Sequence, residues 1–222
     1  MSMYVLMRIL ESAPLRYELG IRLLTLGRLN KAYDRLASHI EGGQQVLDLG
    51  CGTGALTLRA AQRGAKVKGI DINAQMLEVA GKRVHKAGLT ETVDLVEMGV
   101  AELDGEEAQR YDAVMIGLCL SELSEDEVTY TLREVARILR PGGLLLIADE
   151  IKPQGLVKRL MHSLIMYPLA AITYVITQQM THSASNLSRK LMDAGLSIVS
   201  VHLSLLGSFG EFVAQKPAVI PS

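Results

Sequence analysis

The chain has 222 residues, of which 49% are apolar, so it can bury one substantial core and falls within the size range of a single domain. Its 23 basic side chains nearly balance its 24 acidic ones, which excludes the overall positive field that attracts nucleic-acid-binding proteins to phosphate. We therefore expect one domain with decorations and no nucleic-acid partner.

The first part of the chain is predicted to be helical. Residues 1–38 read as two or more helices, because leucines recur at helical spacing, as at Leu19, Leu23 and Leu26. The first ten residues are apolar but have no basic leader and no cleavage pattern. No signal peptide is predicted, and we expect a cytoplasmic protein with a helical cover over residues 1–43.

From residue 44 onward, short apolar runs alternate with helical patterns. The predicted strands are residues 45–49, 65–70, 92–98, 113–118 and 144–148, and the predicted helices are residues 55–63, 74–87 and 125–139, the last capped by Ser124. Such alternation predicts an α/β fold with a doubly wound, mostly parallel sheet. Two further strands, at residues 197–203 and 211–215, have no obvious helix between them, so we expect an antiparallel hairpin there.

An apolar insertion, residues 153–182, separates the fifth strand from this hairpin. Its stretch 160–177 carries no formal charge and approaches the length that spans a bilayer, but Pro168 interrupts it and the chain must return to the same sheet. We interpret the insertion as a lid packed on the N-terminal helices. The alternative is a surface that admits an apolar substrate, with Tyr167 and Tyr174 as contacts, or that docks peripherally on a membrane.

Two observations bear on the partners of this lid. Residues 1–45 hold 6 basic and 4 acidic side chains, residues 46–150 hold 11 and 18, and residues 151–222 hold 6 and 2, so basic flanks surround an acidic centre. This distribution favours peripheral membrane contact. An apolar lid can also close on a second copy of the chain, so a homodimer stays open.

A glycine turn follows the first predicted strand. Residues 46–54, VLDLGCGTG, leave a strand and open a helix, the place where open α/β sheets bind ligands. The turn alone also fits a plain tight turn or a dinucleotide site. Asp48 repels a pyrophosphate but attracts the cationic amino group and sulfonium of S-adenosylmethionine, whereas Asp71, at the end of the second strand, can accept ribose hydroxyls of either ligand.

These motifs together resemble the class I S-adenosylmethionine-dependent methyltransferases, in particular the small-molecule and quinone branch. The resemblance covers residues 44–215, and its segments are residues 46–54, 69–71, 111–114 and 137–143. It implies a Rossmann-like seven-stranded sheet of order 3-2-1-4-5-7-6 with strand 7 antiparallel, in agreement with the terminal hairpin. It also implies that residues 44–222 form the methyltransferase domain.

The resemblance further implies that the turn holds the methionine part of S-adenosylmethionine and that Asp71 holds the ribose. One position departs from the family pattern, because Gly99 replaces the acid that usually faces the adenine amino group. Backbone groups near Val100 and packing from Ile72 would then hold the adenine. The residues predicted to bind the cofactor are Asp48, Gly50, Cys51, Gly52, Gly54, Asp71, Ile72, Gly99, Val100, Ala101 and Gly117.

Methyl transfer from a sulfonium requires alignment of the nucleophile, exclusion of water and, for some acceptors, removal of a proton. At the ends of the fourth and fifth strands, Glu122 and Glu150 are candidate bases and Cys119 is a candidate nucleophile. The alternatives are capping or solvated carboxylates and a small buried thiol. Asp112 is predicted to be structural. Cys51 and Cys119 lack partners at metal-ligand spacing, so we expect reduced thiols and no metal site.

The N-terminal stretch 10–29 is also similar to the leader of methyltransferases associated with corrinoid proteins in anaerobes. This similarity implies a corrinoid or its protein as acceptor or partner. It also implies Tyr17 as a substrate contact, with Tyr17, Arg22 and Tyr33 closing over the cofactor, unless these residues only pack the lid.

The sequence thus favours an enzyme that methylates a small acceptor, either apolar or membrane-derived. Two other functions compete with this interpretation. A non-catalytic S-adenosylmethionine-binding scaffold is kept open by Gly99 and by the lack of an unambiguous base. A nicotinamide-dependent oxidoreductase is disfavoured by Asp48.

Overall fold

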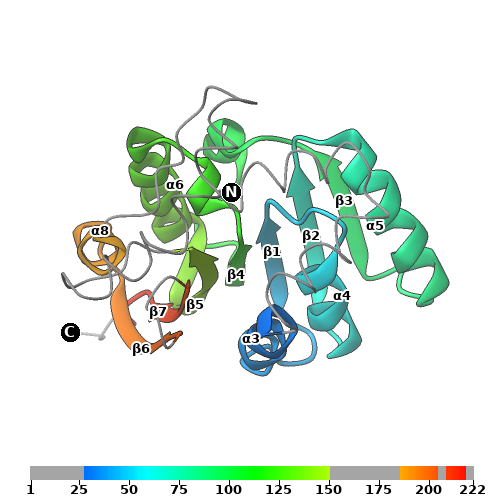
Figure 1. Cartoon of the computed structure of the whole chain (residues 1–222), viewed down its shortest axis with the longest axis horizontal. Helices are drawn as coiled ribbons and strands as arrows, with labels where there is room; N and C mark the ends of the chain where they lie inside the picture. Colours follow the sequence, from blue (N-terminus) through cyan, green and yellow to red (C-terminus); the bar gives the residue numbers. More distant parts are fainter. Residues whose placement is uncertain (1–27, 151–185, 205–208, 219–222) are drawn as a thin grey trace, which may run out of the picture.

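The computed structural model of the protein describes residues 28–150, 186–204 and 209–218 (Figure 1). Its strands are β1 (Gln45–Leu49), β2 (Lys66–Asp71), β3 (Val93–Glu97), β4 (Tyr111–Gly117), β5 (Leu139–Glu150), β6 (Ser197–Leu203) and β7 (Phe209–Gln215). They form one sheet in the order β3-β2-β1-β4-β5-β7-β6, which confirms the predicted doubly wound topology. Strands β1 to β5 pair in parallel, and β7 runs antiparallel to β5 and to β6.

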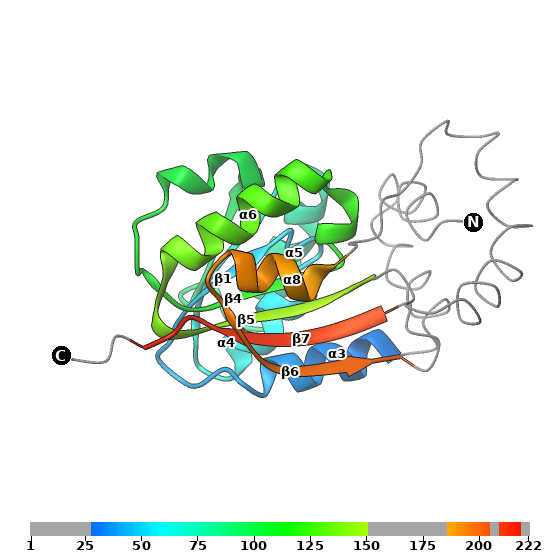
Figure 2. The same ribbon diagram turned by 90° about the vertical axis from the view of Figure 1, so that its left-hand side faces the viewer.

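Helices cover both faces of the sheet (Figure 2). The α-helices are α3 (Arg28–Ala37), α4 (Ala55–Gln62), α5 (Ala74–Lys86), α6 (Glu125–Ile138) and α8 (Leu187–Asp193), and two 3-10 turns are η1 (Val100–Gly105) and η2 (Leu120–Glu122). One apolar core packs α6 and α8 against the sheet, and a second packs α3 and α4 against the opposite face. The alternation along β4 produces this division, because Val114 and Ile116 belong to the first core and Ala113 and Met115 to the second.

Local signals set the starts of the helices that flank the site. The Ser124 hydroxyl accepts a hydrogen bond from the Glu127 backbone N–H, and the Glu127 carboxylate accepts one from the Ser124 backbone N–H. This capping box confirms the predicted start of α6. Asn73 caps α5 by accepting two backbone N–H groups of the first turn, so the chain turns immediately after Asp71.

The register of the parallel strands aligns their carboxyl ends. Leu49 of β1 lies opposite Ile70 of β2 on one side and Ile116 of β4 on the other. Gly117 of β4 lies opposite Ala148 of β5. The residues that follow these positions therefore gather at one edge of the sheet, the edge at which doubly wound proteins bind ligands.

The fifth strand is longer than the sequence predicts. We expect it over residues 144–148, but β5 already begins at Leu139. Its register with β4 shifts across residues 140–143, the Arg-Pro-Gly-Gly segment, and Gly142 has a φ of 81°. Residues 140–143, which precede the predicted strand, are therefore a bulge inside β5.

Helix α8 is not among the predicted helices. It has seven residues, of which only Leu187 and Leu191 are buried. One such pair is too short a pattern to predict a helix from the sequence. The predicted cover is described only from residue 28, and the predicted lid, residues 153–182, lies outside the described residues. Among the helices that the structure describes, none is long and apolar enough to cross a membrane.

Candidate functional site

The glycine turn connects β1 to α4 at the aligned edge of the sheet. Gly50, Gly52 and Gly54 have φ values of 63°, 53° and 79°, a region that side chains disfavour. A Cβ at Gly50 would also lie 2.6 Å from Sγ of Cys119. The turn thus requires glycine for its conformation and for space, and it leaves its backbone open to a ligand.

Asp71 joins the end of β2 to this turn. Its Oδ2 accepts a hydrogen bond from the Gly52 backbone N–H, and its Oδ1 accepts one from the Asn73 backbone N–H, both at 2.8 Å. Burial raises the pKa of Asp71, and these two hydrogen bonds oppose the rise. A carboxylate has about four lone-pair sites, so Asp71 can still accept ribose hydroxyls. Its predicted role as the ribose ligand is compatible with this geometry.

Asp48 precedes the turn by two residues and is 1% exposed. Its Oδ2 accepts a hydrogen bond from Oγ1 of Thr57 at 2.6 Å. Burial raises the pKa of Asp48 to about 7, although the Thr57 hydrogen bond opposes the rise. The group is therefore only partly ionised at neutral pH, and it attracts a cation less strongly than the full charge assumed from the sequence.

A cavity of about 490 Å³ opens beside the turn, between β1, α3 and α4. Five of the residues predicted to bind the cofactor line it: Asp48, Gly50, Cys51, Gly52 and Gly117. The other six predicted residues, Gly54, Asp71, Ile72, Gly99, Val100 and Ala101, are not part of its wall. The cavity therefore corresponds to the predicted methionine end of the site and not to the adenine end.

The residues predicted for the adenine lie beside Asp71. The Met98 backbone N–H donates to the Asp71 carbonyl, which brings the loop after β3 to the end of β2. Ile72 is 77% exposed, and a Cβ at Gly99 would lie 3.2 Å from its Cγ2. Oε1 of Glu102 accepts the Gly99 backbone N–H at 3.0 Å and fixes the loop. In place of an acid, the loop after β3 presents Gly99, which lies beside the exposed side chain of Ile72 from the end of β2.

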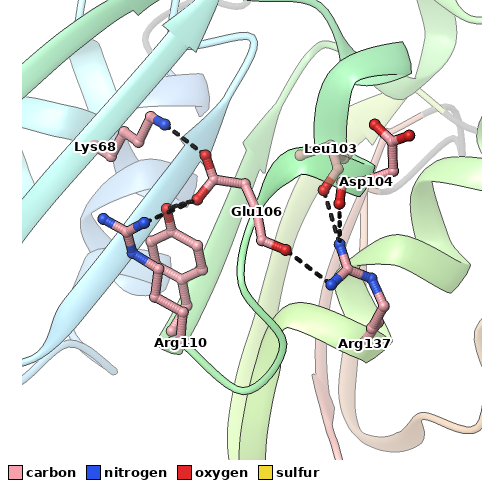
Figure 3. A network of polar contacts seen from close by, with 7 residues as sticks. Lys68, Leu103, Asp104, Glu106, Arg110 and Arg137 are labelled. Atoms are coloured by element: carbon pink, nitrogen blue, oxygen red, sulfur yellow. Dashed lines mark hydrogen bonds and ion pairs between the residues drawn. The ribbon is translucent and has the colours of Figure 1, made fainter.

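The same loop continues into a buried polar network (Figure 3). Glu106 is 6% exposed and accepts hydrogen bonds from Nζ of Lys68 at 2.5 Å and from Oη of Tyr111 at 2.6 Å. Burial acts to raise the pKa of Glu106, but the Lys68 and Tyr111 hydrogen bonds outweigh it and lower the pKa. Arg137 of α6 donates to three backbone carbonyls of this loop. The network anchors the loop that carries Gly99 to β2, β4 and α6.

Asp149 holds the end of β5 against η2. Its Oδ2 accepts a hydrogen bond from the Leu120 backbone N–H, and its Oδ1 accepts one from the Glu150 backbone N–H, both at 2.7 Å. The side chain is fully buried, and burial raises its pKa to about 6 against the effect of its hydrogen bonds. Since both oxygens are engaged with the backbone, the geometry favours a positioning role for Asp149.

The two candidate bases differ in their surroundings. Glu150 is half-buried, and burial together with the charge of Asp149 raises its pKa to about 7. A carboxylate with this pKa is suited to accept a proton at neutral pH. Glu122 is exposed in η2, in keeping with the solvated alternative. Neither side chain lines the cavity.

The candidate nucleophile Cys119 packs at the end of β4 beside Gly50. Burial raises its thiol pKa well above the ordinary value, and the charges of Glu122 and Asp149 raise it further. A neutral thiol is a poor nucleophile, so this environment favours the packing alternative. Burial also raises the pKa of Cys51. The described residues contain no group of three or more potential metal ligands.

Several predicted contacts are not placed by the structure, and others were not predicted. Tyr17, Tyr167 and Tyr174 lie outside the described residues. Conversely, Arg59 and Arg83 line the cavity, although they look like ordinary polar residues of two amphipathic helices. Only the packing of α3, α4 and α5 around the turn brings them to the site, so no local sequence signal could have identified them.

The chain is similar in sequence to known methyltransferases. A family described as "Methyltransferase domain" matches residues 46–143. The ubiquinone/menaquinone biosynthesis C-methyltransferase UbiE of Pseudoalteromonas translucida is 32% identical over 152 residues, which cover 66% of this chain and 59% of that protein. The demethylmenaquinone methyltransferase of Tropheryma whipplei is 30% identical over 159 residues, which cover 69% and 63%. The chain thus spans less than two thirds of the length of these curated relatives.

Solved structures share the fold. A SAM-dependent methyltransferase from Methanosarcina mazei superposes with a TM-score of 0.65 at 21% identity, covering 82% of this chain and 96% of that one. A geranyl diphosphate methyltransferase in complex with SAM superposes with a TM-score of 0.64 at 19% identity, covering 90% of each chain. At such low identity these similarities speak for the fold, not for the acceptor.

Proposed function

Because the chain carries a methyltransferase domain of the class I, S-adenosylmethionine-dependent type, we propose that the protein methylates a small apolar acceptor of the quinone type. The observation that carries the proposal is the meeting of the glycine turn, Asp71 and the cavity at the carboxyl ends of β1, β2 and β4. The quinone class is supported by the names of two relatives, a ubiquinone/menaquinone biosynthesis C-methyltransferase and a demethylmenaquinone methyltransferase.

The residues of the site fit S-adenosylmethionine. Gly50 and Gly52 line the cavity without side chains that would fill it, so the backbone of the turn can accommodate the methionine part. Asp71 offers carboxylate oxygens to the ribose hydroxyls, and the exposed side chain of Ile72 offers an apolar face to the adenine. Asp48, when ionised, attracts the ammonium group. The cofactor supplies an electrophilic methyl group on a sulfonium.

The side chains near the end of β5 would handle the proton of the acceptor. Methylation of a hydroquinone ring carbon forms a carbon–carbon bond, breaks the bond from sulfur to methyl and releases one proton. We assign Glu150 as the group that accepts this proton, because it is half-buried and has a pKa of about 7. Asp149 positions Glu150 by accepting its backbone N–H.

Membrane contact, a corrinoid partner and a homodimer are further proposals. Quinones reside in membranes, so peripheral contact through the uncharged stretch 160–177 would bring the protein to such an acceptor. A corrinoid partner depends on the N-terminal stretch 10–29, and a homodimer depends on the lid. These segments lie outside the described residues, so the corrinoid partner, the dimer and the cytoplasmic location stay predictions.

The proposal is tested by following radiolabel from the methyl group of S-adenosylmethionine into candidate acceptors. The acceptors are a short-chain prenylated naphthohydroquinone and a benzohydroquinone, each lacking one ring methyl, with reduced cobalamin and a simple phenol for comparison. We expect label in one hydroquinone with the wild-type protein and with Lys82→Met, and none with Asp71→Ala. Cofactor binding without transfer to either hydroquinone would refute the acceptor class, and no cofactor binding would refute the enzymatic function.

A further inference from the structure

Most of the exposed large apolar side chains gather beside one edge of the sheet. Five such side chains are exposed among the described residues, and four of them belong to α8 and β6: Met192, Val199, Val201 and Leu203. The fifth, Ile72, directly follows β2. Helix α8 packs against β6, so the four side chains share one region of the surface. Such a cluster indicates an interaction surface.

Strand β6 forms this edge of the sheet, and β7 is the strand that pairs with it (Figure 2). Val201 lies opposite Phe212, and Leu203 lies opposite Gly210. Opposite residues of antiparallel strands share a face of the sheet, and Phe212 belongs to the core beneath α6 and α8. Val201 and Leu203 therefore lie on the face that α8 begins to cover, yet they are 44% and 49% exposed.

The edge lacks most of the features that keep edge strands from pairing further. Such strands present unpaired backbone N–H and C=O groups and are commonly protected by charged residues, proline or a bulge. Strand β6 has seven residues, and none of them is Lys, Arg, Asp, Glu or Pro. Its register with β7 shifts between Ile198 and Ser200, so a bulge distorts only the first part. Residues 200–203 pair regularly with β7 and leave a regular edge on their other side.

The residue pattern of β6 fits a second copy of the same strand. Two antiparallel copies related by a twofold axis at Val201 place Val201 opposite itself and Val199 opposite Leu203. The same register places Ser200 opposite His202. Apolar side chains then meet apolar ones, polar side chains meet polar ones, and no two like charges face each other. Each copy would cover the apolar side chains that the other exposes.

We propose that β6 pairs antiparallel with β6 of a second copy of the chain, with the twofold axis at Val201. The two sheets then form one continuous sheet across the dimer. This interface does not involve residues 153–182, and it does not depend on the proposed function. Two short strands and their flanks make an interface at the small end of the usual range, so we expect a dissociation constant on the order of micromolar.

Sedimentation velocity of the full chain, over a concentration series through the micromolar range, measures this association. Val201→Lys places two ammonium groups opposite each other, so its dissociation constant should rise by roughly tenfold or more. Lysine is common on edge strands, and circular dichroism checks that the variant is folded. Ile72→Lys, which changes the exposed apolar residue outside the cluster, is the matched control and should associate as the wild type does.

Cross-linking tests the register of the two strands. Directly opposite residues of antiparallel strands have Cα atoms about 4.5–5.5 Å apart, within the range of a disulfide, so Val201→Cys should give a covalent dimer on mild oxidation. Ser200→Cys faces His202 of the second copy and should give much less. The wild type, whose Cys51 is buried and whose Cys119 packs beside Gly50, should give none.

Three results would overturn the proposal. The first is a wild-type chain that stays monomeric throughout the concentration series. The second is a dimer that persists unchanged in Val201→Lys, which would place the interface elsewhere on the chain. The third is cross-linking of Val201→Cys that is no greater than that of Ser200→Cys, which would exclude the twofold axis at Val201.

Discussion

The carboxylate of Asp71 accepts the backbone N–H of Gly52 at 2.8 Å, although the two residues are 19 positions apart in the sequence. The contact connects the end of β2 to the turn after β1. It follows from the register, which places Leu49 opposite Ile70 and so brings the next residue of each strand to the same level. The predicted ribose ligand and the predicted methionine cradle are therefore parts of one unit.

We predict that Asp71→Ala weakens cofactor binding by roughly a hundredfold or more, so that calorimetric titration detects no binding. The variant loses the acceptors for the ribose hydroxyls and also the hydrogen bond that holds the Gly52 backbone. Asp71→Asn keeps acceptor oxygen and should bind with intermediate affinity. Asp94→Ala, an exposed aspartate on β3, is the control and should bind S-adenosylmethionine as wild type does.

Asp48 should impose a pH dependence on stability. Its pKa is about 7 in the folded protein, above the ordinary value of 3.8, so the folded state holds the proton more tightly than the unfolded chain. The free energy of unfolding should therefore fall as the pH rises from about 4 to 7. In Asp48→Asn this contribution is absent, so relative to wild type the variant should gain on the order of 2 to 4 kcal/mol between pH 4 and pH 8.

Urea unfolding at several pH values measures this difference. Comparing the two proteins at each pH isolates Asp48 from Asp149 and Glu150, whose pKa values are also raised and which both proteins share. Parallel pH profiles for the two proteins would mean that Asp48 titrates normally. The same variant should bind S-adenosylmethionine more weakly at pH 8, where wild-type Asp48 is ionised.

Glu150 should govern the pH dependence of catalysis. If it accepts the proton of the acceptor, kcat/KM should rise with pH up to about 7 and then level off, because the ionised form is the active one. Glu150→Gln should remove this rising limb and lower kcat by about 10² to 10⁴. Cofactor affinity should be unaffected. A variant that keeps both the rate and the profile of wild type would exclude Glu150 as the base.

The network around Glu106 should matter for the stability of the protein. Lys68→Met removes the closer of the two cations of a buried carboxylate and leaves it only Arg110, at 3.5 Å, which should cost about 3 to 5 kcal/mol of unfolding free energy. Lys82→Met removes an exposed ion pair with Glu78 and should cost less than about 1 kcal/mol. Both are measured by urea unfolding. Similar losses for the two variants would show that burial of Glu106 is not what makes the Lys68 pair important.

The repeating pattern of the sequence determined most of the fold. Apolar runs of five to seven residues, separated by amphipathic stretches with caps such as Ser124, specify strands and helices locally, and their alternation leaves few topologies. The sequence also allowed the glycine turn and Asp71 to be assigned to a cofactor site. Each is defined by its position directly after a strand, and parallel strands bring such positions to one edge of the sheet.

Other features depended on contacts between distant segments. Residues 140–143 form a bulge inside β5 because Leu139, which precedes them, also pairs with β4. The raised pKa of Asp48 arises from its burial, whereas in the sequence Asp48 appears simply as a charged residue. Arg59 and Arg83, which the sequence did not point to, reach the cavity through the packing of α3, α4 and α5. Local patterns determine what each segment becomes, whereas burial, protonation and the wall of a cavity are properties of segments in contact, so only the tertiary structure decided them.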